Sequence, residues 1–406
     1  MNSRMKWMVV SSSTCLTVLL LTGMMLGKSS DQSSDTYKHL RVFSEVVGHI
    51  KEEYVEEPDM KAVSLGALDG MLEAVDPFAS YLDANQYQEY LKNKDAHRAD
   101  VGLILSKKFG YLGVLDSIPN SPAAKAGMGY SDVIEGINGV SVRDMALATA
   151  YSLLQGDSGT AVELTVVRVR HPDPATISLV RANVVLPPVE SKMLDGQVGY
   201  INIDALSPAV VKETAAAVEK LQKDGAQKLV LDLRSCAAGA PDDGIALANL
   251  FLSKGLITYE QGQRVPRQNF NADPSKTVTS LPLAVLTNRG TASGAEIAAA
   301  ALMGNNRAQL VGERTYGDAS VRRTLTMDDG GAIILSVAKY YSPDGKAVQD
   351  TGVTPGVVVN EPEPQVDIDE NGEPISGPPE AVPPQPKKTE DDPVVKKALE
   401  VLGVKA

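Results

Sequence analysis

The sequence predicts a multidomain chain in which a helical N-terminal segment precedes a small α+β module and a larger α/β domain. The 406 residues, 43% hydrophobic and 22% charged, suffice for two or more ordinary globular cores. Apolar residues recur at helical spacing before residue 95, whereas the run at 228–234 is continuous, as in a buried strand. Between these regions the sequence favours a β-rich module with one or two helices.

Residues 1–30 are expected to be a targeting segment. Arg4 and Lys6 precede a mostly apolar run at 7–26, and a polar stretch begins at Lys28. This order is typical of a signal peptide or an uncleaved signal anchor. No A-x-A cleavage site is evident, which favours an anchor. The rest of the chain is then expected in the cell envelope, in the periplasm or another extracytoplasmic space, with residues 7–26 in the membrane.

The charge and the cysteines exclude some classes of partner. The formal net charge is −12, and a phosphate-binding face needs concentrated Lys and Arg, so nucleic acid is not expected as a partner. Two cysteines, Cys15 and Cys236, give no disulfide framework. The sequence predicts neither a cofactor nor a metal site.

Residues 35–95 are predicted to be helical. Apolar side chains recur there every three or four residues, the period of an amphipathic helix. They form two sets, Leu40, Phe43, Val46, Val47 and Ile50, then Ala62, Leu65, Leu68, Met71 and Leu72. Residues 76–82, which contain Pro77, are expected to be a structural turn that ends this pattern.

Residues 96–186 are predicted to form the β-rich module. Ser-Pro-Ala-Ala-Lys-Ala-Gly at 121–127 and Asp-Val-Ile-Glu-Gly-Ile-Asn-Gly at 132–139 resemble signatures of PDZ domains. The run Val101-Gly102-Leu103-Ile104 resembles the PDZ loop whose N–H groups bind a peptide's terminal carboxylate, while the peptide adds a strand to the sheet. Gly102 is otherwise an ordinary turn glycine. The resemblance implies protein or peptide C-termini as partners.

Residues 187–360 are predicted to form the α/β domain, and the stretch around Ser293 has local features of an active site. The apolar run at 283–286 is expected to be a buried strand, followed by a small-residue turn and an alanine-rich helix at 295–303. Free N–H groups and the helix dipole at a helix N-terminus stabilise an oxyanion, which suits a nucleophile. Because Ser is also a preferred helix cap, the local pattern leaves both roles open for Ser293.

The sequence around this serine resembles that of a peptidase family. Residues 288–297 are similar to the N-x-G-S-A-S-A-S-E-I motif of the carboxyl-terminal processing peptidases, or tail-specific proteases, and Ser293 matches their catalytic serine. Residues 311–317 resemble their V-G-E-x-T-F-G motif, and further resemblance at 76–82 and 338–356 extends over most of the chain. The resemblance implies a serine peptidase with a PDZ domain and an α/β core of the ClpP/crotonase type.

The residues that support the nucleophile in this family differ here. The family continues with K-G-x-V-Q, in which the lysine is the general base and the glutamine orients it. The matching positions are Asp318, 25 residues after Ser293, and Arg322. A lysine takes the serine proton only when it is neutral. An aspartate near Arg322 is expected to be ionised and ion-paired, so it is a weak base.

Few other groups are available as a substitute base. All four histidines precede the segment that carries Ser293, which excludes a Ser-His-Asp arrangement within that domain. Lys339 is the only lysine between Ser293 and the turn at 342–345, and it is retained as a substitute candidate.

The oxyanion hole is also expected to be altered. Residues 231–239 resemble the family's L-D-L-R-x-N-P-G-G turn, which contributes an oxyanion N–H, but the N-P-G part is lost. Gly239 and Gly294 remain as candidate donors. If the turn needed a positive φ at Ala238, that residue would be strained.

The chain is expected to end in a flexible tail rich in Pro and acidic residues at 361–392 and a short amphipathic helix at 393–406. Taken together, these features predict a pseudopeptidase. Its PDZ domain is expected to bind protein C-termini, and its partner is a client protein, an active peptidase or an adaptor. The alternative is an active serine endopeptidase that cleaves C-terminal tails with Ser293.

Overall fold

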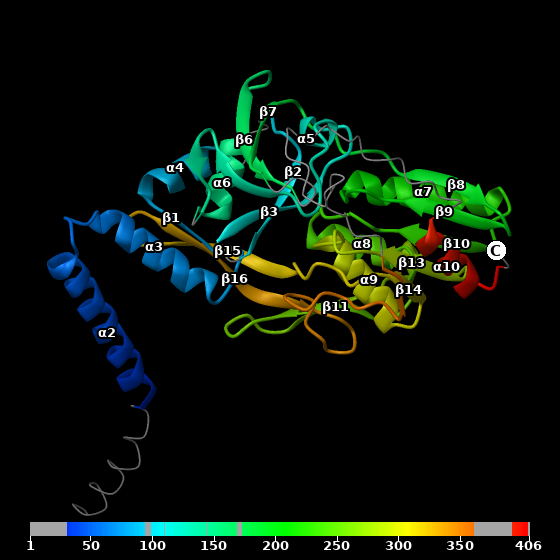
Figure 1. Ribbon diagram of the computed structural model, residues 1–406. Coiled ribbons are helices and arrows are strands. Elements are labelled where there is room, and N and C mark those ends of the chain that lie inside the picture. Colours follow the sequence, from blue (N-terminus) through cyan, green and yellow to red (C-terminus); the bar gives the residue numbers. More distant parts are fainter. Residues whose placement is uncertain are drawn as a thin grey trace, which may run out of the picture. The chain divides into compact units, whose positions relative to one another are not determined.

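The computed structural model describes the chain in several ranges (Figure 1). These are residues 31–93, 99–108, 110–143, 145–168, 173–360 and 392–404. The predicted targeting segment, residues 1–30, and nearly all of the predicted flexible tail lie outside them. Within these ranges, no helix has the length and apolar character needed to cross a membrane.

The chain divides into two compact units, Met1–Ala67 and Leu68–Ala406. The first contains α2 (Asp31–Glu53), and α3 (Met60–Glu73) spans the boundary. The predicted helical region continues in the second unit with α4 (Ala84–Asn93). It also contains a strand that was not predicted, β1 (Ser80–Leu82).

The predicted PDZ module is an antiparallel sheet with two helices. The sheet order is β2-β3-β4-β6-β7, and β5 pairs with β4. The strands are β2 (Leu103–Lys108), β3 (Tyr111–Ser117), β4 (Val133–Ile137), β5 (Val140–Ser141), β6 (Ala161–Val167) and β7 (Ala175–Val180). The helices are α5 (Pro122–Lys125) and α6 (Leu147–Leu154). Strand β2 is therefore an edge strand.

The α/β domain is built on a mainly parallel sheet of order β17-β14-β13-β10-β9-β8. Its strands are β8 (Glu190–Leu194), β9 (Val198–Asn202), β10 (Lys228–Asp232), β13 (Leu283–Thr287), β14 (Ala308–Gly312) and β17 (Val357–Val358). Strands β9 and β13 are buried along their whole length, because helices cover both faces of the sheet. This explains their apolar sequences.

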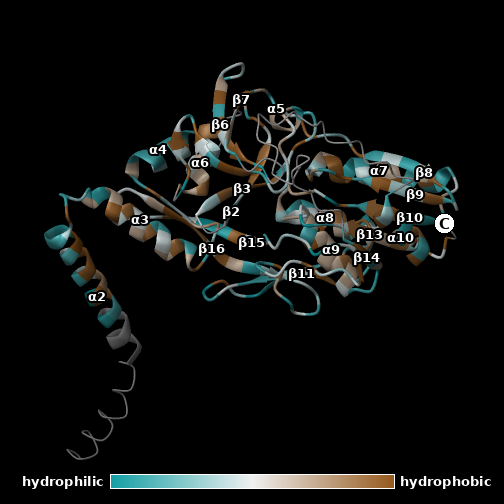
Figure 2. Ribbon diagram, in the orientation of Figure 1, coloured by the Kyte–Doolittle hydropathy of each residue, from teal (hydrophilic) through white to brown (hydrophobic). Residues whose placement is uncertain are grey.

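Four helices cover the parallel sheet. They are α7 (Pro208–Lys223), α8 (Pro241–Asn249), α9 (Gly294–Gly304) and α10 (Pro393–Val401). Leu229 and Leu231 pack with α7, α8 and α9, whereas Val230 packs on the opposite face with α10. Every residue of α9 from Gly294 to Leu302 is buried, and the helix is coloured toward the hydrophobic end of the scale in Figure 2. Its small residues allow this close packing.

A second sheet joins distant parts of the sequence. Its order is β1-β16-β11-β12, and β15 also pairs with β16. The strands are β11 (Leu256–Gln261), β12 (Gln268–Asn271), β15 (Ser320–Thr326) and β16 (Ala332–Tyr341), and a short 3-10 helix spans Pro274–Lys276. Ser80 lies opposite Ile334, so the turn at residues 76–82 is held next to the strands that follow Asp318.

Candidate functional site

Ser293 lies immediately before α9, as predicted. Its backbone has φ 54° and ψ −124°, a conformation that non-glycine residues rarely adopt and that is common at functional sites. Its Oγ donates a hydrogen bond to the carbonyl oxygen of Gly239 at 2.8 Å. Its N–H donates to Oε2 of Glu296 at 3.2 Å, which is one half of a helix capping box. The fold thus points the hydroxyl towards the Gly239 turn.

A buried carboxyl group, Glu296, joins the nucleophile position to the base position. It is fully buried and accepts hydrogen bonds from Gly317 N at 2.7 Å and Thr315 Oγ1. Its Oε2 accepts from Asp318 N at 2.8 Å as well as from Ser293 N. Burial raises the pKa of Glu296 to about 8. Our sequence interpretation did not assign Glu296 a role, although its place three residues after Ser293 is a capping-box signal.

The base position holds an ion pair. The Arg322 guanidinium contacts Oδ1 of Asp318 through Nη2, and the two side chains are 31% and 20% exposed. Burial raises the pKa of Asp318, and the positive charge of Arg322 opposes this shift. The carbon Cζ of Arg322 lies 4.5 Å from the centroid of the Phe78 ring. Asp318 therefore interacts with a cation that is itself fixed by an aromatic ring.

The substitute candidate, Lys339, has another partner. Its Nζ bonds Oδ2 of Asp350 at 2.6 Å, and both side chains are about half exposed. A general base must lie within hydrogen-bond reach of the proton it accepts, whereas this amine is half exposed and held by a carboxylate. This placement does not favour Lys339 as the base.

The turn that leads to Gly239 differs from our expectation. Positive φ values occur at Ser235 (57°) and Gly239 (141°) and not at Ala238, so the condition under which Ala238 would be strained is not met. A Cβ at Gly239 would collide with Leu206, and one at Gly294 would collide with the carbonyl of Ala240. Both glycines are thus required by close packing. The carbonyl of Gly239 faces Ser293, whereas an oxyanion hole needs N–H donors in that place.

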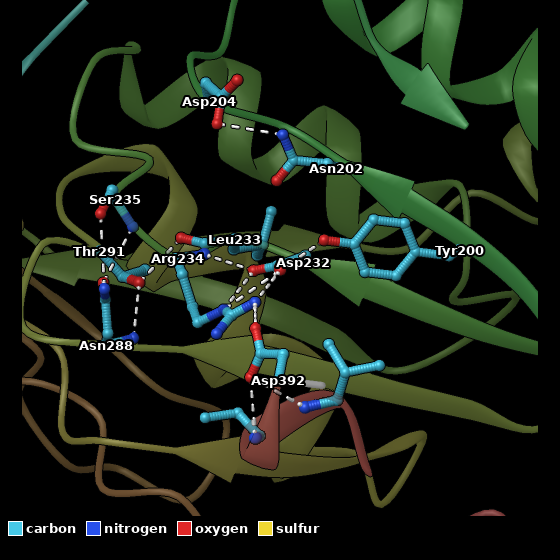
Figure 3. A network of polar contacts seen from close by, with 12 residues as sticks. Tyr200, Asn202, Asp204, Asp232, Leu233, Arg234, Ser235, Asn288, Thr291 and Asp392 are labelled. Atoms are coloured by element: carbon cyan, nitrogen blue, oxygen red, sulfur yellow. Dashed lines mark hydrogen bonds and ion pairs between the residues drawn. The ribbon is translucent and has the colours of Figure 1, made fainter. Parts of the chain in front are cut away.

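A buried polar network fixes this turn against the nucleophile loop (Figure 3). Arg234 is 3% exposed, and its Nη2 lies 2.6 Å from Asp232 Oδ2 and 2.7 Å from Asp392 Oδ2. Asn288 Oδ1 accepts from the N–H of Ser235 at 2.8 Å and of Gly290 at 3.0 Å. The segments on both sides of the site are therefore held by contacts between residues far apart in sequence.

In the loop that resembles a carboxylate-binding loop, one backbone donor is already bonded within the chain. Val101, Gly102 and Leu103 are buried, and Leu103 and Ile104 begin β2. Gly102 has φ 78°, and a Cβ there would collide with Ser121, which explains the glycine. Its N–H donates to Oδ1 of Asp100 at 2.6 Å. The Asp100 carboxylate thus accepts the N–H of Gly102, one of the donors expected for a ligand's carboxylate.

The edge of β2 is occupied as well. The hydroxyl of Tyr151, on α6, accepts from the N–H of Leu105 at 2.8 Å and donates to its carbonyl at 3.4 Å. A peptide that adds a strand to an edge uses such unpaired backbone groups. Such a peptide would have to displace the Tyr151 hydroxyl.

The PDZ module packs directly on the loops around Ser293. Leu115 of β3 forms a small apolar cluster with Ala237 and Ala292, and Ile104 and Tyr316 pack against it. Ala292 precedes Ser293, and Ala237 belongs to the turn before Gly239. Strand β2 and the loops on both sides of Ser293 therefore share one apolar cluster.

Comparisons with known proteins agree with this arrangement. Residues 197–359 match the model of peptidase family S41, and residues 113–168 match a PDZ domain. A carboxy-terminal-processing protease of Bartonella bacilliformis is 30% identical over 83% of this chain and 79% of its own. The carboxy-terminal processing protease CtpA of Bacillus subtilis is 32% identical, over 85% and 74%. The solved structure of a photosystem II D1 C-terminal processing protease has a TM-score of 0.65 and 27% identity, covering 78% of this chain and 86% of that one.

Proposed function

Because this chain belongs to the carboxy-terminal processing protease family, we propose that it binds protein C-termini through its PDZ domain without hydrolysing them efficiently. The observation that carries the proposal is the Asp318–Arg322 ion pair at the position of the base. The expected ligands of the PDZ domain are the C-termini of client proteins, of an active peptidase or of an adaptor.

The charges at the site support weak or absent hydrolysis. Activating a serine requires a group that accepts its proton and is held within hydrogen-bond reach. Here the Ser293 hydroxyl donates to a backbone carbonyl, which is not a base, and the carboxylate of Asp318 is engaged by Arg322. Both features oppose formation of an alkoxide.

We expect purified wild-type protein to bind a peptide with a free apolar C-terminus and to leave it intact. Amidation should weaken binding by roughly 1–3 kcal/mol, because a buried donor is left unpaired. Calorimetry would give both affinities, and chromatography of the same mixtures, with Ser293→Ala as the comparison, would detect cleavage. If wild type cleaves and Ser293→Ala does not, the chain is an active serine peptidase. Lys339→Ala would then test the substitute base.

Tyr151→Phe is expected to tighten peptide binding by about threefold to tenfold, the equivalent of one net hydrogen bond. The change keeps the ring and removes the hydroxyl that occupies the N–H and C=O of Leu105. A suitable control is Tyr111→Phe, because Tyr111 is an exposed tyrosine on β3. Equal affinities of Tyr151→Phe and wild type would show that peptides do not add a strand to β2.

A further inference from the structure

A cavity of about 340 Å³ lies beside the Asp318–Arg322 pair, lined by residues of α4, α6, β1, β15 and β16. Its walls include Phe78, Tyr90, Tyr151, Gln155 and Arg322. Of the described residues that line it, Arg322 is the only charged one, and its partner Asp318 does not line the cavity. This arrangement favours a ligand with a negative group and an adjoining apolar part.

Arg322 retains binding capacity on the cavity side. A guanidinium group has five N–H donors. Asp318 is the only hydrogen-bond acceptor of this group among the described residues. Contact with the Phe78 ring restricts the guanidinium group, which lowers the entropy lost when a ligand binds.

Another arginine of this chain shows how a guanidinium group can bind two carboxylates at once. Arg234 lies between two carboxylates, with Nη2 at 2.6 Å from Asp232 and 2.7 Å from Asp392. Planar guanidinium groups suit this role because their donors match carboxylate oxygens. Arg322 has one carboxylate partner, Asp318, and it also lines the cavity.

The cavity adjoins the groove in which a peptide strand would lie. Leu147, Tyr151 and Gln155 follow one another at four-residue steps along and just beyond α6, and all three line the cavity. The hydroxyl of Tyr151 meanwhile reaches the edge of β2 at Leu105. A strand that replaced this hydroxyl on β2 would have side chains facing α6 and the cavity.

We propose that Arg322 and this cavity bind an acidic side chain of the peptide held on β2. The site would make Arg322 a specificity residue that selects C-terminal segments with an Asp or Glu upstream of the last residue. This inference rests on the proposed function, because it assumes that a peptide C-terminus binds the PDZ domain.

The test uses the full chain and peptides with a free apolar C-terminus, in which one Glu is moved from the second to the sixth residue from the end. Each is compared by calorimetry with the peptide that carries Gln at that place. When Glu stands at one or two of these peptide positions, wild type should bind the Glu peptide about tenfold more tightly than the matching Gln peptide. This is the usual gain from a charge-assisted hydrogen bond. In Arg322→Gln this ratio should fall to about one, and in Arg322→Lys it should be intermediate. Arg323→Gln is the matched control, because neighbouring residues of β15 face opposite sides.

The outcomes separate this site from the proposed function. If free peptides bind better than amidated ones but Glu gives no advantage, the Arg322 site is rejected and C-terminus binding stands. A Glu advantage that survives in Arg322→Gln also rejects the site. If Arg322→Gln instead abolishes the penalty for amidation, the terminal carboxylate occupies the cavity, and the side-chain assignment is wrong. If no peptide binds wild type, both are rejected. If Arg322→Gln unfolds at a lower temperature than wild type, the affinities of Arg322→Lys are compared with those of wild type instead.

Discussion

The double variant Asp318→Lys with Arg322→Gln is expected to hydrolyse unstructured peptides in a Ser293-dependent way, on the order of 10³-fold faster than wild type. A nucleophile and its base act as one unit, so supplying the missing base has an effect of several powers of ten. The backbone positions of Ser293 and residue 318 are already fixed relative to each other, because both N–H groups donate to Glu296. Rates of peptide cleavage for the two proteins would test the prediction.

The single variants provide the internal comparison. Asp318→Lys alone places a second cation beside Arg322, and Arg322→Gln alone leaves no amine base, so each should recover less activity than the pair. Recovery should also stay below that of an intact peptidase, because the Gly239 carbonyl faces Ser293. Adding Ser293→Ala to the double variant must abolish the new activity. A well-folded double variant that cleaves no faster than wild type would show that the base position is not what limits the site.

Arg234→Leu is expected to lower the free energy of unfolding by about 3–5 kcal/mol, the usual cost of removing one member of a buried ion pair. Asp232 is fully buried, and without Arg234 its charge would lose the guanidinium donors that face it, while the hydroxyl of Tyr200 at 2.7 Å and the backbone N–H of residue 234 would remain. Asp392 would lose its ion-pair partner too. Urea denaturation followed by circular dichroism would measure the change.

Two comparisons make this result specific. Arg264→Leu replaces an exposed arginine in the same domain and should change stability by no more than about 0.5 kcal/mol. Combining Arg234→Leu with Asp232→Asn and Asp392→Asn should recover part of the loss, because no buried charge is then left alone. A loss below about 1 kcal/mol for Arg234→Leu would mean that the network in Figure 3 contributes little to stability.

Local sequence predicted much of the architecture. The apolar run at 283–286 and the small residues after it specify a buried strand and a turn into α9, and the structure has both. The charges at 318 and 322 predicted an ion pair, and the pair is present. Such features depend on residues close together in the chain, which is where pattern and spacing are informative.

The remaining parts of the site depend on contacts across long separations. Phe78 reaches Arg322 because β1 pairs with β16, and a three-residue strand gives little periodic signal. Tyr151 reaches Leu105 across the PDZ module, and nothing in the sequence of α6 indicates that its hydroxyl bonds an edge strand. Strain was expected at Ala238 only if the turn needed a positive φ there. The left-handed conformation is instead taken by Ser235, whose N–H is bonded by Asn288 from another loop.

The position of α10 has a consequence for how the domain is made. Val394 and Val395 pack on the face of the parallel sheet that includes Val230 and Leu286, so this face is covered by residues translated more than a hundred positions after β13. While the ribosome synthesises the intervening segment, these sheet residues remain open to water and to other chains. Contacts of such long sequence separation form late and slow folding. Until α10 has been synthesised and has packed on the sheet, this apolar face is therefore available for aggregation.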